Sequence, residues 1–293
     1  MVITQLDPGV WGILATPFHD DLSVDETSLE RLVAHYEGIG ARGVVALGVL
    51  GEAARLDSRE RRQVLERVTA GGLPVVAGIS SLSTAPAVEE ARAAAAAGVQ
   101  AVMVLVPTAD AGALAKHLRA ISAACGLGVV VQDHPATTGV VIGVQELARA
   151  VADSGVAAAV KQESPPTAVR VAQRVNVGVP VFGGLGGVNL LDELLCGAAG
   201  AMTGFAVPEA LVATVDAFRD AGPAAACAAY APWLPLALFE SQQPVSLALR
   251  KEILRRRGFL ATAVVRPPGS PFPPELERAL DAYLAAVDLP VSA

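Results

Sequence analysis

The stretch VAAAVKQE at residues 156–163 decides the fold, because an uninterrupted apolar run leads directly into Lys161. Such a continuous run is typical of a parallel strand that is covered on both faces. Similar runs recur along the chain, separated by longer segments with helical spacing. The runs are 11–16, 44–48, 75–78, 101–105, 129–132, 157–161, 181–183 and 201–203.

Successive runs begin about 20 to 33 residues apart, the length of one strand-loop-helix unit. Eight parallel units of this kind predict a closed (β/α)8 barrel, or TIM barrel, an α/β fold. No residue signature repeats from unit to unit, which disfavours a solenoid. A doubly wound open sheet is the second possibility. It would need the turn G-x-G-x-x-G for dinucleotide binding, but ATPFHDD occupies that place at 15–21.

The helix signals agree with this division. Asp25 and Asp57 are predicted N-caps. Helical periodicity is present at 58–69, 84–97 and 144–153. After the last strand, residues 207–287 predict the eighth barrel helix and about three more, broken by prolines. We therefore expect a barrel over 1–222 and, as an appendage, a C-terminal helical extension over 223–293.

Composition excludes several classes of protein. The net charge of −7 and the lack of basic runs mixed with aromatic residues argue against binding to nucleic acid or to an anionic membrane surface. No run reaches the roughly 18 apolar residues of a membrane span, and no secretory signal is evident at the N-terminus, so we expect a cytoplasmic protein. A small molecule is the expected partner. The basic residues of 250–257 are expected on a solvated or subunit-facing helix face rather than at an anion site.

In a barrel of this kind, function lies at the C-terminal ends of the strands, where Lys161 is the unusual residue. An ammonium that ends an apolar run is partly desolvated, which disfavours its charged form, and a neutral amine is a nucleophile. It would attack a 2-oxo acid to form an imine. Lys116 and Lys251, the other lysines, fall on predicted helices. The alternative is a lysine that extends to solvent, and position alone does not decide between the two.

Three further side chains qualify as partners of Lys161. Glu163 shares its strand face if the strand continues, and it would act as a general acid or base or hold the ammonium. Gln132 closes the preceding strand, and His134 follows two residues later. His134 is equally interpretable as a rim histidine before Pro135. Asp133 should face away from Gln132 and serve as a structural hydrogen-bond acceptor.

Four motifs in register carry a resemblance to a known family. They are G-x-x-G-E at 48–52, the strand ending in Lys161, T-G at 138–139 and V-R-P-P at 265–268. A-T-P-F at 15–18, F-G-G at 182–184 and G-A-A-G-A at 197–201 fit the same order. Across nearly the whole chain, they together resemble the dihydrodipicolinate synthase / N-acetylneuraminate lyase family. The members of this family form Schiff bases on a (β/α)8 barrel.

The resemblance implies roles for individual residues. Lys161 matches the imine-forming lysine. Backbone N–H groups around Val49 and Leu50 match the loop that binds the substrate carboxylate, whereas Glu52 is expected to order that loop. The remaining positions that match the substrate site are Gly48, Thr16, Gly183 and Met202.

Several positions depart from the family pattern. Gln132 stands in place of the Tyr that shuttles protons, Val49 in place of a relay Thr, and Ala109 in place of a second relay Tyr. Thr137 stands where the lysine-pathway synthases have an Arg for the second substrate. Family members that dehydrate or deaminate sugar-derived 2-oxo acids are similar in having Q-D in place of Y-N, and this favours their chemistry here.

The sequence therefore predicts a class I lyase: a dehydratase, deaminase or aldolase of a 2-oxo acid, without cofactor or metal, acting as a homo-oligomer (dimer or tetramer). The alternatives are a dihydrodipicolinate-synthase-like condensation and a barrel that has lost turnover and binds a metabolite. Contacts to the distal end of the substrate are expected from Ser80, Ser81, Thr108 and small residues. A pocket of such low polarity favours a short or partly apolar substrate, although small side chains could equally make room for backbone and water contacts.

Overall fold

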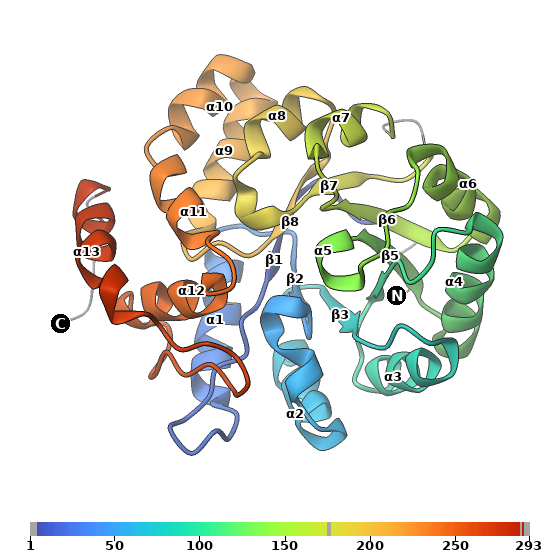
Figure 1. Cartoon of the computed structure of the whole chain (residues 1–293), viewed down its shortest axis with the longest axis horizontal. Coiled ribbons are helices and arrows are strands. Elements are labelled where there is room, and N and C mark those ends of the chain that lie inside the picture. The colour runs from blue at the N-terminus through green and yellow to red at the C-terminus, as the bar shows by residue number, and fades with distance from the viewer. Residues whose placement is uncertain (1–4, 175–176, 288, 290–293) are drawn as a thin grey trace.

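Eight parallel strands pair side by side in chain order, and the last strand pairs with the first to close the barrel (Figure 1). This computed structural model describes residues 5–174, 177–287 and 289. The strands are β1 Gly9–Ile13, β2 Gly43–Ala46, β3 Val75–Ile79, β4 Ala101–Leu105, β5 Gly128–Asp133, β6 Ala157–Gln162, β7 Val181–Gly183 and β8 Gly200–Thr203. The predicted (β/α)8 barrel is thereby confirmed.

Helices follow the strands, and all of those named here except α5, which lies over the end of the barrel, cover its outside (Figure 1). They are α1 Glu26–Gly38, α2 Ser58–Thr69, α3 Thr84–Ala96, α4 Ala111–Cys125, α5 Pro135–Thr138, α6 Val144–Ser154, α7 Thr167–Ala172, α8 Leu190–Leu195 and α9 Pro208–Ala221. Asp25 caps α1, and Asp57 forms a reciprocal capping box with Glu60 at α2. Short 3₁₀ helices span Val49–Gly51, Ala53–Arg55, Leu185–Gly187 and Pro274–Leu276.

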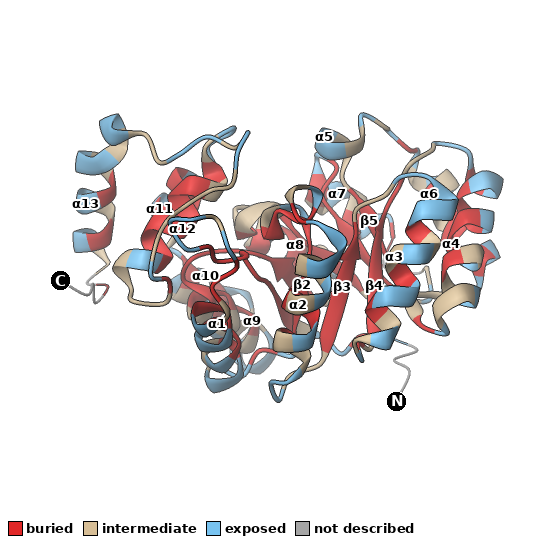
Figure 2. Cartoon of the chain, turned by 90° about the horizontal axis from the view of Figure 1, so that it is seen from below, coloured by how far each residue is buried: buried red, intermediate tan, exposed pale blue. Residues whose placement is uncertain are grey.

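Strand residues alternate between the barrel interior and the layer beneath the helices. Val130 and Ala159 belong to the interior cluster, whereas Val131 and Val160 pack in the outer layer. Figure 2 shows the strands as buried along most of their length. The same alternation turns the next inward positions, at the C-terminal ends of β5 and β6, toward the mouth of the barrel.

The register between β5 and β6 decides which polar side chains meet at that mouth. Gln132 lies opposite Lys161, and Asp133 lies opposite Gln162. Because neighbouring residues on a strand face opposite ways, Gln132 and Lys161 share the inner face, and Asp133 and Gln162 share the outer one.

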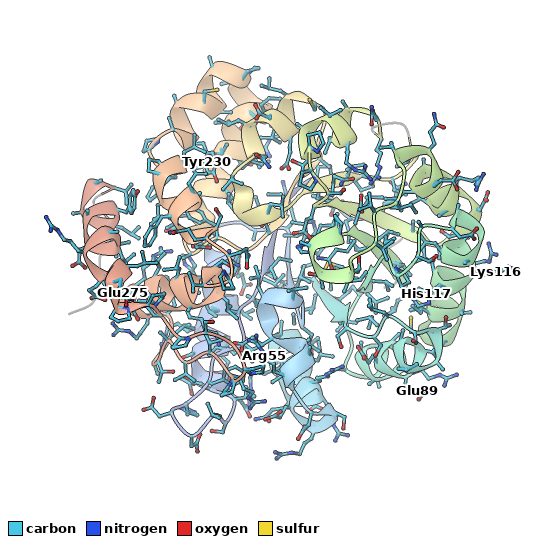
Figure 3. The ribbon with its side chains drawn as sticks, viewed as in Figure 1. Arg55, Glu89, Lys116, His117, Tyr230 and Glu275 are labelled. Atoms are coloured by element: carbon cyan, nitrogen blue, oxygen red, sulfur yellow. The ribbon has the colours of Figure 1, made fainter. Side chains whose placement is uncertain are left out.

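The C-terminal extension contains four helices in the part that the structure describes, one more than predicted: α10 Pro223–Tyr230, α11 Leu234–Glu240, α12 Ser246–Arg256 and α13 Glu277–Ala286 (Figure 1). Pro223 and Pro235 lie in the first turns of α10 and α11, where proline starts helices instead of ending them. Tyr230, labelled in Figure 3, is buried and donates a hydrogen bond to the Gly187 carbonyl at 2.9 Å. The extension is therefore fastened to the loop after β7. The predicted division at 222/223 falls on Gly222, between α9 and α10, and stays a prediction.

Over residues 5–174, 177–287 and 289, none of the helices has the length and apolarity needed to span a bilayer.

Candidate active site

A cavity of about 620 Å³ opens at the C-terminal end of the barrel. Residues from the strand ends, the loops that follow them and the C-terminal extension enclose it. The lining comprises Ile13, Val49, Leu50, Gln132, His134, Ala136, Thr137, Lys161, Glu163, Leu185, Gly186, Val188, Thr203, Ser241, Gln243, Ser246 and Arg250. It is large enough for a small organic acid.

Lys161, Glu163 and Gln132 form a connected polar group on the wall of this cavity. The Nζ atom of Lys161 lies 3.2 Å from Oε2 of Glu163, and both side chains are at least nine-tenths buried. The amide of Gln132 donates to the same carboxylate oxygen at 2.7 Å. The N–H of Leu185 lies 3.3 Å from the other oxygen, and Gly184 leaves the space that the Glu163 side chain fills.

The neighbours of Glu163 set its electrostatics. Burial by itself would raise the pKa of Glu163, but the Lys161 ammonium, His134 and the hydrogen bond from Gln132 outweigh burial and lower it. Glu163 is therefore held as a carboxylate beside the amine of Lys161.

His134 lies at the rim of the cavity. Its Nδ1 accepts a hydrogen bond from the N–H of Thr137 at 3.1 Å, which caps α5, and its backbone has left the extended region. This matches the rim interpretation, although His134 still lines the cavity with Thr137.

The loop after β2 forms another wall. Val49 and Leu50 begin a 3₁₀ helix, and among the hydrogen bonds of the described residues neither of their N–H groups is a donor. Thr16 does not line the cavity; it donates to the carbonyl of Gly51 at 2.6 Å and holds the loop from β1. Gly48 and Ser80 line an adjoining cavity of about 200 Å³. This smaller cavity shares Val49, Gln132 and Thr137 with the large one.

Two other predicted positions lie away from the cavity lining. Met202 is fully buried in the interior cluster beneath the mouth. Gly183 faces outward, where a Cβ would be 1.7 Å from the carboxylate of Glu193 on α8. Glu193 is fully buried, and within the described residues neither of its carboxylate oxygens has a hydrogen-bond partner. Burial raises the pKa of Glu193 to about 7.

The outer faces of β5 and β6 carry a structural cluster. Asp133 accepts from Gln162 and from Arg170, each at 3.0 Å, and Arg174 lies 3.3 Å away. Asp133 thus faces away from Gln132, as expected, and the cluster fixes the two strands whose inner faces hold the polar group.

Glu52 orders its loop by joining it to the extension. Lys251 Nζ donates to Glu52 at 2.5 Å, and the N–H of Arg266 donates at 2.9 Å. Arg55, labelled in Figure 3, adds an ion pair at 2.8 Å. Burial lowers the pKa of Lys251 to about 8, against the attraction of Glu52. Lys251 is therefore a second buried amine, although it does not line the cavity.

The expectation of a solvated or subunit-facing basic face at 250–257 is wrong for Arg250 and Lys251, and also for Arg257, whose side chain is 7% exposed and pairs with Glu209. Arg250 is 4% exposed and Lys251 is not exposed, because buried carboxylates on other segments pair with them. Arg256 pairs instead at the surface with Glu277 and Asp281 of α13.

The distal wall of the cavity comes from the extension, which sequence reasoning had treated as an appendage. Ser241, Gln243, Ser246 and Arg250 contribute to it, whereas Ser81 and Thr108 do not. This wall is polar, contrary to the expected low polarity. The sequence shows only an amphipathic segment that is interrupted by prolines and contains basic residues. Such a pattern does not indicate that the segment lines the cavity at the mouth of the barrel.

Comparison with known proteins decides the family. Residues 7–287 match the model of the dihydrodipicolinate synthetase family. The chain belongs to this family. It is 31% identical over 283 residues to 4-hydroxy-tetrahydrodipicolinate synthase of Methanothrix thermoacetophila, covering 93% of this chain and 94% of the relative.

A second similar family member is L-2-keto-3-deoxyarabonate dehydratase of Azospirillum brasilense, 28% identical over 294 residues, with 96% of this chain and 94% of the relative covered. Among solved structures, dihydrodipicolinate synthase of Rhodopseudomonas palustris superimposes with a TM-score of 0.91 at 31% identity, covering 98% of this chain and 99% of that one. The family thus includes both synthases and a dehydratase.

No group of three or more metal-ligating side chains occurs in the part of the chain that the structure describes.

Proposed function

We propose that the protein is a class I lyase that dehydrates a hydroxylated 2-oxo acid through an imine on Lys161. The observation that carries the proposal is the buried contact of 3.2 Å between Lys161 and Glu163 in the wall of the cavity. An amine and a carboxylate so placed supply a nucleophile and a group that takes and returns its proton.

The first stage forms the imine. Lys161 passes a proton to Glu163, and the neutral amine attacks C2 of the 2-oxo acid. The carbinolamine then takes the proton back from Glu163 on its hydroxyl, and water leaves as the C2=N bond forms. The N–H groups of Val49 and Leu50, which have no acceptor among the described residues, hold the substrate carboxylate meanwhile.

The second stage eliminates water from the substrate. Glu163 removes a proton from C3, and the electron pair moves to form the enamine. The C4 hydroxyl takes that proton and leaves as water, which gives a conjugated iminium. Hydrolysis frees the product and restores the amine of Lys161. Gln132 cannot transfer protons, and its hydrogen bond to Glu163 orients the carboxylate.

Two observations favour dehydration over synthase-like condensation. Thr137 lines the cavity where the synthases are expected to carry an arginine, and the dehydratase relative aligns over nearly the whole chain. Deamination and retro-aldol cleavage would use the same imine and are outcomes of the assay below. A barrel without turnover would not need the Lys161–Glu163 pair.

Borohydride trapping tests the proposal. Wild-type protein is incubated with pyruvate or with a 2-oxo-3-deoxy-4-hydroxy acid, reduced, and analysed by peptide mass spectrometry. We expect a stable adduct on Lys161 and release of the dehydrated product from the hydroxylated acid. Lys161→Met should abolish the adduct, and Lys116→Met, an exposed lysine on α4, should not. A folded wild-type protein that forms no adduct with any 2-oxo acid would overturn the proposal.

The predicted dimer or tetramer and the cytoplasmic location are part of this proposal. Sedimentation velocity of the purified protein measures the oligomeric state, and a purely monomeric species would contradict the predicted dimer or tetramer.

A further inference from the structure

His134 uses one edge of its ring within the protein and leaves the other edge open. It follows β5 and lines the same cavity as Lys161. Its Nδ1 atom accepts the hydrogen bond from the N–H of Thr137, so the proton of the neutral ring is assigned to Nε2. That Nε2–H group has no acceptor among the described residues. It is a donor on the cavity wall that awaits a partner.

The Nε2 atom of His134 is accessible. The part of the chain that the structure describes contains several buried polar atoms without a hydrogen-bond partner, among them Nη1 of Arg250, and Nε2 of His134 is not one of them. His134 as a whole is half-buried. Burial raises the pKa of Glu163, and Lys161 and His134 are among the groups that lower it, so the ring lies within electrostatic range of that carboxylate. The open edge of the ring is therefore available to a molecule bound in the cavity.

Other donors of the cavity wall are engaged within the protein. Gln132 donates to Glu163 at 2.7 Å, and Gln243 donates to Ser246 at 2.9 Å. The N–H of His134 is by contrast uncommitted, and it is best matched by a ligand that brings an acceptor. Because Glu163 is held as a carboxylate nearby, a second substrate carboxylate at this place would meet like charge. A hydroxyl oxygen accepts from Nε2–H without that repulsion.

We infer that His134 donates from Nε2 to a hydroxyl oxygen beyond C3 of the substrate, and so favours hydroxylated 2-oxo acids over unsubstituted ones and over those with a second carboxylate. The inference rests on the proposed function, because it takes the imine at Lys161 as the other fixed point. His134 is thus a specificity residue at the rim, whereas the proton transfers belong to Glu163. Its hydrogen bond with Thr137 holds the ring in the orientation that binding needs.

The test compares three acids with the same carbon chain in the trapping assay: 2-oxopentanoate, 4,5-dihydroxy-2-oxopentanoate, and 2-oxoglutarate, which has a distal carboxylate. Half-saturating concentrations are measured for wild type, His134→Asn and His134→Gln. Asparagine keeps an oxygen that caps α5 at the N–H of Thr137 but has no donor at the place of Nε2, whereas glutamine carries an amide N–H that reaches this place. His19→Asn, at an exposed histidine outside the cavity lining, is the matched control.

We expect His134→Asn to reduce the preference for the dihydroxy acid over 2-oxopentanoate about 3- to 10-fold, the range of one neutral hydrogen bond. His134→Gln should keep most of the preference, and His19→Asn should leave it unchanged. An unchanged preference in His134→Asn, with adducts still forming on Lys161, would overturn the inference and leave the proposed function standing.

Two other results would also overturn the inference alone. A fall in kcat of His134→Asn without a change in preference would show that His134 transfers protons instead of binding the hydroxyl. Preference of the wild type for 2-oxoglutarate over the dihydroxy acid would contradict the assignment of an uncharged oxygen. Absence of every adduct in folded wild type would instead overturn the proposed function, and this inference with it.

Discussion

Two walls of the cavity differ in where their residues come from. The barrel wall, formed by Gln132, Lys161 and Glu163, consists of neighbours on two paired strands. The extension wall, formed by Ser241, Gln243, Ser246 and Arg250, comes from a segment that follows the last strand by almost 40 residues. The comparison shows that strand register alone places Gln132, Lys161 and Glu163 together, whereas the position of the other wall depends on how the extension packs.

The walls also differ in how their charges are compensated. Lys161 and Glu163 pair with each other inside the cavity, where substrate can separate them. Arg250 pairs with Glu240, which is not part of the cavity lining. In the proposed function, the barrel wall transfers protons and the extension wall contacts the rest of the substrate.

After loss of Lys161, the largest effect on activity is expected from Glu163→Gln. This substitution removes the proton acceptor of the barrel wall and keeps the shape of the side chain. Loss of the proton acceptor should lower kcat by about 10²- to 10⁴-fold and change KM little. Steady-state kinetics on the hydroxylated acid measure this. Glu146→Gln, on the surface of α6, is the control. Wild-type kcat in Glu163→Gln, combined with a large loss in His134→Asn, would move the role to His134.

The next prediction concerns the ion pair between Lys251 and Glu52, which anchors the extension to the loop after β2. Lys251→Met leaves Glu52 buried without its ammonium and should destabilise the protein by about 3 kcal/mol. Adding Glu52→Gln should restore most of that stability, because no buried charge is then left unpaired: Arg55, which also pairs with Glu52, is 29% exposed and stays hydrated. Urea unfolding of both variants measures the difference, and equal stability of the single and double variants would contradict this account of the pair.

The last effect is confined to neutral and higher pH and concerns Glu193, which lies behind the barrel wall. Its pKa is raised from 4.5 to about 7, so the folded protein holds the proton more tightly than the unfolded chain does. This stabilising contribution is complete below pH 4.5 and is lost as pH rises to about 7.

Glu193→Gln cannot ionise and should be more stable than wild type by up to about 3 kcal/mol at pH 8, with a much smaller difference at pH 5. Urea unfolding at the two pH values gives the comparison. The same difference at both would show that Glu193 does not titrate in this range.

Most of the fold could be predicted from the sequence because every strand is buried on both faces. The predicted strand ends are wrong where buried residues continue beyond the strand. The sequence predicts the first strand at 11–16, but β1 ends at Ile13, because Leu14 and Ala15 are buried in the loop that follows it. Prolines were interpreted as breaks, although some of them begin helices, and the extension therefore gained one helix.

The barrel wall was predictable for the same local reason. Period-two alternation placed Glu163 beside Lys161 and turned Asp133 outward. The ion pairs of Arg250 and Lys251 could not be predicted, because Glu240 and Glu52 lie on other elements and only tertiary packing brings them close. The role of Gly183 was likewise hidden, since the space beside it belongs to Glu193.

The Glu52–Lys251 pair has a consequence for engineering. Exchange of extensions between family members would be a direct way to transplant the distal wall and so to change substrate preference. An extension taken from a family member without a cation at position 251 would leave the Glu52 carboxylate without its ammonium partner. The loop that carries Val49 and Leu50 would then be less firmly held. A transplant therefore has to move residues 52 and 251 together, as one inherited unit.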